Sequence, residues 1–205
     1  MIELYTNTTS NGRKISIALE ELALPYNAIK IDTQAGASRT PEYLQINPNG
    51  KIPAIVDPEG PGGQRFVMFE SAAILIYLAD KTGRLLAYKG AARYAALQWL
   101  QVEASGVSSD AFWLFYIGLK EKNEQAATML RADLARLYGV LDKRLGHAPY
   151  LAGEELTIAD IAHFPWVAGA AAWQGIDLAP FAHLRRWYDE LAIRDSFQKG
   201  MKIPA

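Results

Sequence analysis

The sequence predicts an α/β domain followed by an all-helical domain. Two observations carry this prediction. Strand and helix patterns alternate over residues 1–80, whereas from Ala91 onward strand patterns nearly vanish and alanine, leucine and arginine recur with aromatic residues at helical intervals. We place the first domain at residues 1–81 and the second at residues 90–205, with residues 82–90 as the linker.

The first domain has short elements in a definite order. Ile2 and Leu4 mark a strand, and apolar residues at helical spacing from Ile15 to Leu22 mark the helix after it. We then expect a strand over 26–31, a short helix over 41–44, a strand over 52–56, a hairpin to a strand over 66–68, and a helix over 71–79. The order βαβ, helix, ββα is thioredoxin-like, a small sheet with helices on both faces.

The second domain is expected to contain only helices. They are predicted near residues 91–118, 123–146, 157–171 and 180–192, with a short one after Arg194. Thr157 and Asp160 have the spacing of a capping box, in which Asp160 stands in for the usual glutamate. That motif predicts a helix start and carries no chemistry.

Composition excludes several classes of function. The 21 basic and 22 acidic residues nearly cancel, so no broad basic field is available to bind nucleic acid. The absence of cysteine excludes disulfides, thiolate metal sites and a cysteine nucleophile. The three histidines have no metal-ligand spacing, and we expect no metal. Without a basic leader or a long apolar run, the chain is expected to be cytoplasmic and not to bind a membrane.

Residues 49–53 (Asn-Gly-Lys-Ile-Pro) predict a site for an extended peptide. We expect the Ile52–Pro53 bond to be cis, with the N–H and C=O of Ile52 facing outward, where a peptide strand can pair with them. The alternative is that Pro53 follows a trans bond and only begins an edge strand.

Glu70 and Ser71 open the last helix of the first domain. Ser71 is placed to cap that helix, and a helix N-terminus suits a carboxylate. Glu70 is placed to approach an ammonium group. The alternative is an ordinary cap beside a solvated acid, and for Ser71 both interpretations can hold together.

The loop after the first strand, residues 5–14 (Tyr-Thr-Asn-Thr-Thr-Ser-Asn-Gly-Arg-Lys), presents hydroxyls, an amide and helix N–H groups together. A thiolate there would gain hydrogen bonds of about 1.5–3 kcal/mol each, which lower a thiol pKa by roughly one to two units. The alternative is that Thr8, Thr9 and Ser10 only cap the helix.

Together these segments resemble the cytosolic glutathione S-transferases, and most closely the bacterial nu class with its disulfide-bond oxidoreductases. The resemblance spans nearly the whole chain. It rests on residues 9–12 (Thr-Ser-Asn-Gly), 49–53, 69–71 (Phe-Glu-Ser), 137–141 (Leu-Tyr-Gly-Val-Leu) and 156–162 (Leu-Thr-Ile-Ala-Asp-Ile-Ala). It implies a thioredoxin-like N-terminal domain, an all-α C-terminal domain and glutathione as co-substrate.

The resemblance also implies where the sulfur lies. Thr9 and Asn11 match the loop threonine and asparagine close to the glutathione sulfur in the nu class, and Ser10 is a neighbour that can substitute. These three are the expected catalytic residues. Tyr5 lies too early, inside the strand, to match the tyrosine of tyrosine-type classes, and it is expected in the core.

The rest of glutathione is assigned by the same resemblance. Ile52, with Pro53, would hold the cysteinyl backbone, and Lys51 the glycine carboxylate. Glu70 and Ser71 would hold the γ-glutamyl end.

Three departures from the nu class are visible. Ser38 stands where members often carry a glutamine, and we include it among the expected glutathione contacts. Some members carry an arginine on the face toward the partner subunit, and its position aligns near Met129 here, with Arg131 close by. Residues 110–113 also differ from the glycine-rich sequence of the corresponding helix in the class. These departures weaken the case for two glutathiones per site and leave the single-glutathione site intact.

The function implied is a glutathione-dependent transferase that activates glutathione as a thiolate for attack on a small apolar electrophile or a disulfide. The alternatives are a glutathione-dependent disulfide reductase or peroxidase, and a non-catalytic binder of glutathione and apolar ligands. The family also implies a homodimer. Candidate walls for the second substrate are Asp110, Trp113, Phe115, Tyr116, Trp166 and Trp173.

Overall fold

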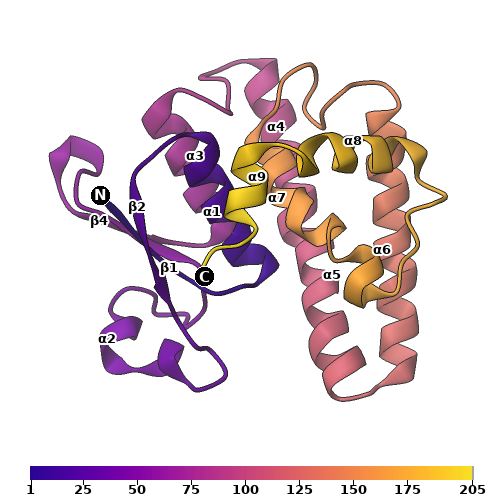
Figure 1. Ribbon diagram of the computed structural model, residues 1–205, viewed down its shortest axis with the longest axis horizontal. Coiled ribbons are helices and arrows are strands. Elements are labelled where there is room, and N and C mark those ends of the chain that lie inside the picture. The colour runs from indigo at the N-terminus through magenta and orange to yellow at the C-terminus, as the bar shows by residue number, and fades with distance from the viewer. Residues whose placement is uncertain (205) are drawn as a thin grey trace. The chain divides into compact units, whose positions relative to one another are not determined.

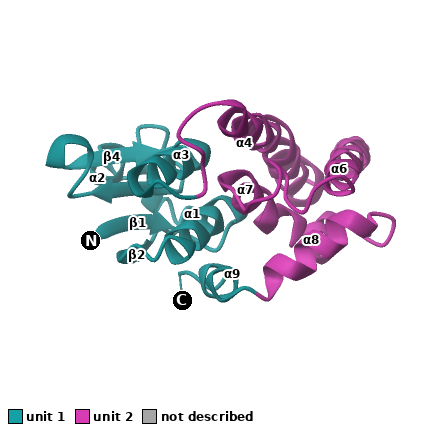
Figure 2. Ribbon diagram, turned by 90° about the horizontal axis from the view of Figure 1, so that it is seen from above, with its two compact units in different colours: residues 1–84, 194–205 teal, residues 85–193 magenta. Residues whose placement is uncertain are grey.

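The computed structural model describes residues 1–204, which divide into two compact units (Figure 2). Unit 1 contains Met1–Arg84 together with the residues from Arg194 onward, and unit 2 is Leu85–Ile193. No helix among the described residues is both long enough and apolar enough to cross a bilayer.

Unit 1 is built on a four-stranded mixed sheet in the order β2-β1-β3-β4. Its strands are β1 (Ile2–Thr6), β2 (Tyr26–Lys30), β3 (Ala54–Asp57) and β4 (Phe66–Phe69). β2 runs parallel to β1, whereas β3 is antiparallel to both β1 and β4. This is the thioredoxin-like layout that the order of elements predicts.

Helices cover both faces of this sheet. Successive side chains of a strand point to opposite faces, so each strand contributes side chains to both layers of helices. Leu4 is fully buried on the face covered by α1 (Ser10–Glu21) and α3 (Ser71–Thr82), which lie side by side (Figure 1). Tyr5 points to the other face, where its ring makes an edge contact with Tyr43 of α2 (Pro41–Leu44) at 6.0 Å. Tyr5 is therefore half-buried beneath α2 and does not belong to the main core.

Single 3₁₀ turns occur at Ala37–Arg39 and Pro61–Gly63.

The short C-terminal helix α9 (Asp195–Gly200) packs against α1 within the same unit (Figure 1). Ser16 donates a buried hydrogen bond to the carbonyl of Gly200 at 2.7 Å. A Cβ added at Gly200 would lie 2.5 Å from the backbone nitrogen of Ile17, so only glycine permits this approach. The end of the chain therefore stabilises the helix that begins at Ser10.

Unit 2 is all-helical, as predicted. A helical run from α4 (Ala91–Val102) through α5 (Ser108–Trp113) contains two π-helical segments, Glu103–Val107 and Leu114–Lys120. It is followed by α6 (Glu124–Leu145), α7 (Ile158–Val167), a π-helical segment at Ala170–Gln174, and α8 (Ala182–Ala192). The π-helical segments are a feature that the apolar periodicity did not predict.

The capping box at the start of α7 is confirmed. Thr157 accepts a hydrogen bond from the backbone N–H of Ala159, and the fully buried carboxylate of Asp160 accepts one from the N–H of Thr157 at 2.9 Å. The same carboxylate accepts from the N–H of Leu151 at 2.9 Å and from the indole of Trp187 at 3.0 Å. Burial raises the pKa of Asp160, and these hydrogen bonds act in the opposite direction.

Candidate functional site

The loop residues predicted to meet a thiol lie at the start of α1. Thr9 is the N-cap, and its Oγ1 accepts from the N–H of Gly12 at 3.2 Å. A hydroxyl that accepts in this way still has its own proton to donate. A Cβ added at Gly12 would lie 2.3 Å from Thr6 Oγ1, so α1 begins tightly against the end of β1. Capping and activation are thus compatible roles for Thr9.

Asn11 and Ser71 are brought together by a residue that the sequence did not single out. Lys14, only 1% exposed, places its Nζ 2.6 Å from Asn11 Oδ1 and 3.3 Å from Ser71 Oγ. Ser71 in turn donates to Asn11 Oδ1 at 3.5 Å. We call Asn11, Lys14 and Ser71 the junction cluster, since it joins the first turns of α1 and α3. The i, i+3 spacing of Asn11 and Lys14 was the available signal.

The start of α3 differs from the expectation in one respect. Glu70 occupies the N-cap position without a side-chain capping bond, and Ser71 is the first helical residue. The predicted capping role of Ser71 is therefore wrong, because its hydroxyl points to the junction cluster instead. Glu70 has φ +70°, which costs a non-glycine residue on the order of 1–3 kcal/mol. Its carboxylate accepts from Asn49 Nδ2 at 3.4 Å.

The segment before β3 has the predicted backbone geometry. The Ile52–Pro53 bond is cis, as expected; a second cis bond, Ile203–Pro204, was not predicted. The carbonyl of Lys51 accepts from the hydroxyl of Tyr43 and from Asn47 Nδ2, both at 2.7 Å. These two hydrogen bonds hold the backbone of Lys51 in place, while its side chain is exposed.

Ser38 lies apart from this arrangement. It is 3% exposed within the turn Ala37–Arg39. Its neighbour Arg39 donates to the carbonyl of Asn49 at 3.3 Å and so links this turn to the segment before β3. Ser38 thus lies in a turn that Arg39 links to the segment before β3, and among the described residues no hydrogen bond joins Ser38 itself to another predicted site residue.

Tyr5 is a poor source of a phenolate base. Its burial, followed by the hydrogen bond to the carboxylate of Glu3 at 3.0 Å, raises the pKa of the Tyr5 phenol. The hydroxyl is engaged by Glu3 on the α2 face of the sheet.

The aromatic residues predicted to line a second-substrate pocket divide into two groups. Trp113, Phe115 and Tyr116 are 40–47% exposed on α5 and the π-helical segment after it. Trp166 is instead buried, and its indole donates to Glu103 at 2.7 Å. Trp166 is therefore a core residue of unit 2.

Asp110, also on α5, has an unusual carboxyl group. Partial burial, followed by the hydrogen bond and charge of Asp133, raises the pKa of Asp110 to about 6. Trp173 lies 6.2 Å from Phe115, ring centroid to centroid, and extends the aromatic group.

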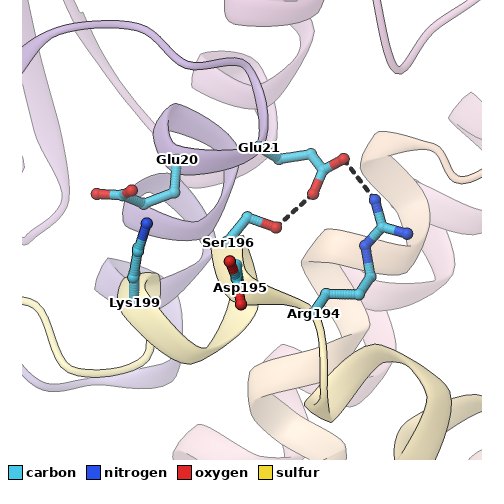
Figure 3. Close-up of a pocket in the computed structure, with 6 residues that line it drawn as sticks. All are labelled: Glu20, Glu21, Arg194, Asp195, Ser196 and Lys199. Atoms are coloured by element: carbon cyan, nitrogen blue, oxygen red, sulfur yellow. Dashed lines mark hydrogen bonds and ion pairs between the residues drawn. The ribbon is translucent and has the colours of Figure 1, made fainter.

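A polar hollow of about 380 Å³ lies at the other end of α1 (Figure 3). The carboxylate of Glu21 accepts from Arg194 at 2.7 Å and from the hydroxyl of Ser196. From Asn11 to Glu21 the helix rises about 15 Å, so this hollow is remote from the junction cluster. None of the predicted site residues lines it, and its ion pair fastens α9 to α1.

Comparisons with known proteins agree with this geometry. Residues 9–81 match the model of the glutathione S-transferase N-terminal domain, and residues 107–195 match that of the C-terminal domain. The disulfide-bond oxidoreductase YfcG of Escherichia coli is 43% identical over 199 residues, covering 95% of this chain and 91% of that protein.

The solved structures that share the fold include two with glutathione or glutathione disulfide bound. A Pseudomonas fluorescens glutathione transferase family member with two glutathione bound has a TM-score of 0.93 at 40% identity, covering 99% of this chain and 93% of that one. A Pseudomonas putida glutathione transferase with one glutathione disulfide bound per subunit has a TM-score of 0.90 at 38% identity, covering 100% and 92%.

The chain belongs to the glutathione S-transferase family. The Escherichia coli disulfide-bond oxidoreductase YghU is 33% identical over 213 residues, covering 97% of this chain and 73% of that protein. The similarity to YfcG and YghU shows that the chain is of the bacterial, nu-like type within that family.

Proposed function

We propose that this protein is an enzyme that binds glutathione on unit 1, activates it as a thiolate, and uses it to reduce disulfides. The observation that carries the proposal is the junction cluster. It joins the starts of α1 and α3, where partial positive charge and donor groups suit the anionic parts of a ligand.

Glutathione would lie along three segments of unit 1. Its γ-glutamyl carboxylate would take the hydroxyl of Ser71, and its α-ammonium group would approach Glu70. The cysteinyl backbone would pair with the backbone of Ile52, whose bond to Pro53 is cis, as expected. The glycine carboxylate would approach the exposed ammonium of Lys51. Ser38 would support this end from the neighbouring turn.

The thiol would then lie at the start of α1. Thr9 is the proposed main donor, because its hydroxyl proton is not consumed by the capping bond from Gly12. Asn11 would supply a second donor, and Ser10 is the neighbour that can substitute. Each hydrogen bond to a thiolate contributes about 1.5–3 kcal/mol, enough to lower the thiol pKa by roughly one to two units. A thiolate is then populated near neutral pH.

Disulfide reduction balances with glutathione as the only reductant. The thiolate attacks one sulfur of the substrate, a mixed disulfide with glutathione forms, and the other substrate sulfur leaves as a thiolate. A second glutathione attacks the mixed disulfide, which gives glutathione disulfide and a second reduced substrate thiol. Because the chain has no cysteine, both steps use glutathione sulfur. The similarity to YfcG favours this reaction over conjugation, which begins with the same thiolate.

The proposal extends to assembly and location. We propose a homodimer in the cytoplasm, as in the family that the chain resembles. Sedimentation at micromolar concentration should give about twice the chain mass of 22.6 kDa. A single species at the chain mass would remove the dimer from the proposal without affecting the assignment of the glutathione site.

The test is a parallel assay of the purified protein with glutathione as donor. One arm follows reduction of hydroxyethyl disulfide, and the other follows conjugation of an aryl halide. We expect disulfide turnover to exceed conjugation. Binding of glutathione without turnover in either arm, and without thiolate absorbance, would show a non-catalytic binding protein and contradict the proposal.

A further inference from the structure

Lys14 is almost completely buried, although lysine is rarely buried unless its ammonium group is paired. Its Nζ contacts Asn11 one helical turn earlier in α1 and Ser71 at the first position of α3. Under the proposed function, Asn11 serves the sulfur and Ser71 serves the γ-glutamyl carboxylate. One ammonium group therefore contacts residues assigned to two different parts of glutathione, the cysteinyl sulfur and the γ-glutamyl carboxylate.

The contact with Asn11 decides how the amide is turned. An ammonium group donates hydrogen bonds and accepts none, so the amide atom 2.6 Å from Nζ must be the oxygen. The Nδ2 donors of Asn11 consequently face away from Lys14. A thiolate is an acceptor, and the donor side of the amide is the side that stabilises it. Lys14 thus selects the useful orientation of Asn11.

The contact with Ser71 has a related effect. Lys14 donates to Ser71 Oγ at 3.3 Å, so that lone pair is occupied and the hydroxyl proton must point elsewhere. In the structure this proton is directed to Asn11 Oδ1 at 3.5 Å, which is a weak hydrogen bond. A carboxylate arriving at the start of α3 offers a stronger acceptor. Asn11 Oδ1 would still keep its hydrogen bond from Lys14.

We infer that Lys14 is a positioning residue that couples the sulfur subsite and the γ-glutamyl subsite of the glutathione site. It orients the Asn11 amide toward the sulfur and directs the Ser71 proton toward the γ-glutamyl carboxylate. This inference rests on the proposed function, and it concerns a residue that acts through Asn11 and Ser71 without touching the reacting atoms.

The test compares Lys14→Met with Lys14→Gln. Methionine fills a similar volume and removes every donor, whereas glutamine keeps a neutral donor of shorter reach. Lys30→Met is the matched control, because Lys30 is an exposed lysine at the end of β2. For each variant the thiolate absorbance of bound glutathione is titrated, and KM and kcat are measured in the disulfide assay.

We expect Lys14→Met to raise the pKa of the bound thiol by about one pH unit and KM for glutathione by about tenfold. Lys14→Gln should recover part of both effects, and Lys30→Met should change neither. The decisive comparison repeats Lys14→Met in an Asn11→Ala background. In that background Lys14→Met should raise the pKa of the thiol by less than about half of the increase it causes in the wild-type background, because the two residues act as one unit.

Two results with these variants would overturn the inference. One is that Lys14→Met leaves the pKa of the bound thiol unchanged. If the melting temperature of this variant falls at the same time, the role of Lys14 is structural alone. The other is an equal pKa increase in the wild-type and Asn11→Ala backgrounds, which would mean that Lys14 does not act through Asn11. Thiolate absorbance in the wild-type protein tests the proposed function separately.

A measurement on the unmodified protein covers the case in which neither variant folds. The nitrogen NMR resonance of the Lys14 ammonium should move when glutathione is added. A resonance that stays in place at saturating glutathione would contradict the inference.

Discussion

Replacing Ser71 by alanine separates glutathione binding from folding. In the structure Ser71 does not cap α3, and its two hydroxyl contacts, to Asn11 and Lys14, are 3.5 and 3.3 Å long. Both are long and weak, but one comes from the buried ammonium of Lys14, so their loss should lower the free energy of unfolding by about 1 kcal/mol, which leaves the protein folded. Its proposed hydrogen bond to the glutathione carboxylate involves a charged group and is worth about 1.5–3 kcal/mol.

These magnitudes give a clear expected pattern for Ser71→Ala. The dissociation constant of glutathione and KM should rise about ten- to hundredfold, since each 1.4 kcal/mol is a factor of ten. The turnover number should fall less, because the contact is remote from the sulfur. Isothermal titration calorimetry and steady-state kinetics measure both. Ser105→Ala is the control, since that exposed hydroxyl donates to the carbonyl of Gln101 within its own helical run. An unchanged dissociation constant with a collapsed turnover number would refute the assignment of Ser71.

Three further predictions concern stability. Asp160→Ala should lower the free energy of unfolding by at least about 3 kcal/mol in urea titrations, because it leaves buried N–H donors unpaired; a change under about 1 kcal/mol would contradict this. Gly200→Ala should cost about 1–3 kcal/mol and speed hydrogen exchange in α9, since its Cβ would clash with the backbone of Ile17; unaltered exchange would speak against the close packing. Burial alone would raise the pKa of Asp57, but hydrogen bonds, including that from Lys81, lower it. Its ion pair therefore stabilises the fold above about pH 4, and this stabilisation is lost as pH falls through the lowered pKa. Asp57→Asn should therefore make the free energy of unfolding fall less steeply as pH decreases below about 4. The same steepness in the variant and the wild-type protein would exclude this role.

The element order of unit 1 and the helices of unit 2 were predictable because their signals are local. Apolar periodicity places α1 and α6, and the cluster of turn residues before Phe66 places the hairpin of β3 and β4. The cis bond at Ile52–Pro53 was predictable from the surrounding motif rather than from proline alone.

The features that were not predicted depend on contacts between distant segments. Lys14 looks like a solvated residue in the sequence, yet the approach of α3 to α1 buries it against Ser71, 57 positions away. The packing of α9 on α1 joins Ser16 to Gly200, 184 positions apart. Ser71 has the residue type of a helix cap, but the presence of Asn11 and Lys14 gives its hydroxyl other partners.

The measurement that tests the central claim most directly is the pKa of the thiol of bound glutathione, titrated by thiolate absorbance in Thr9→Ala, Thr9→Ser and Ser10→Ala. Because Thr9 also caps α1, thermal melting of each variant accompanies the titration. We predict that Thr9→Ala raises this pKa by about one to two units, from the loss of one charge-assisted hydrogen bond, and lowers turnover about ten- to hundredfold. Thr9→Ser should keep both the cap and the low pKa, and Ser10→Ala should change little. A pKa that stays unmoved in Thr9→Ala but rises in Ser10→Ala would contradict the account and assign the activating hydroxyl to Ser10.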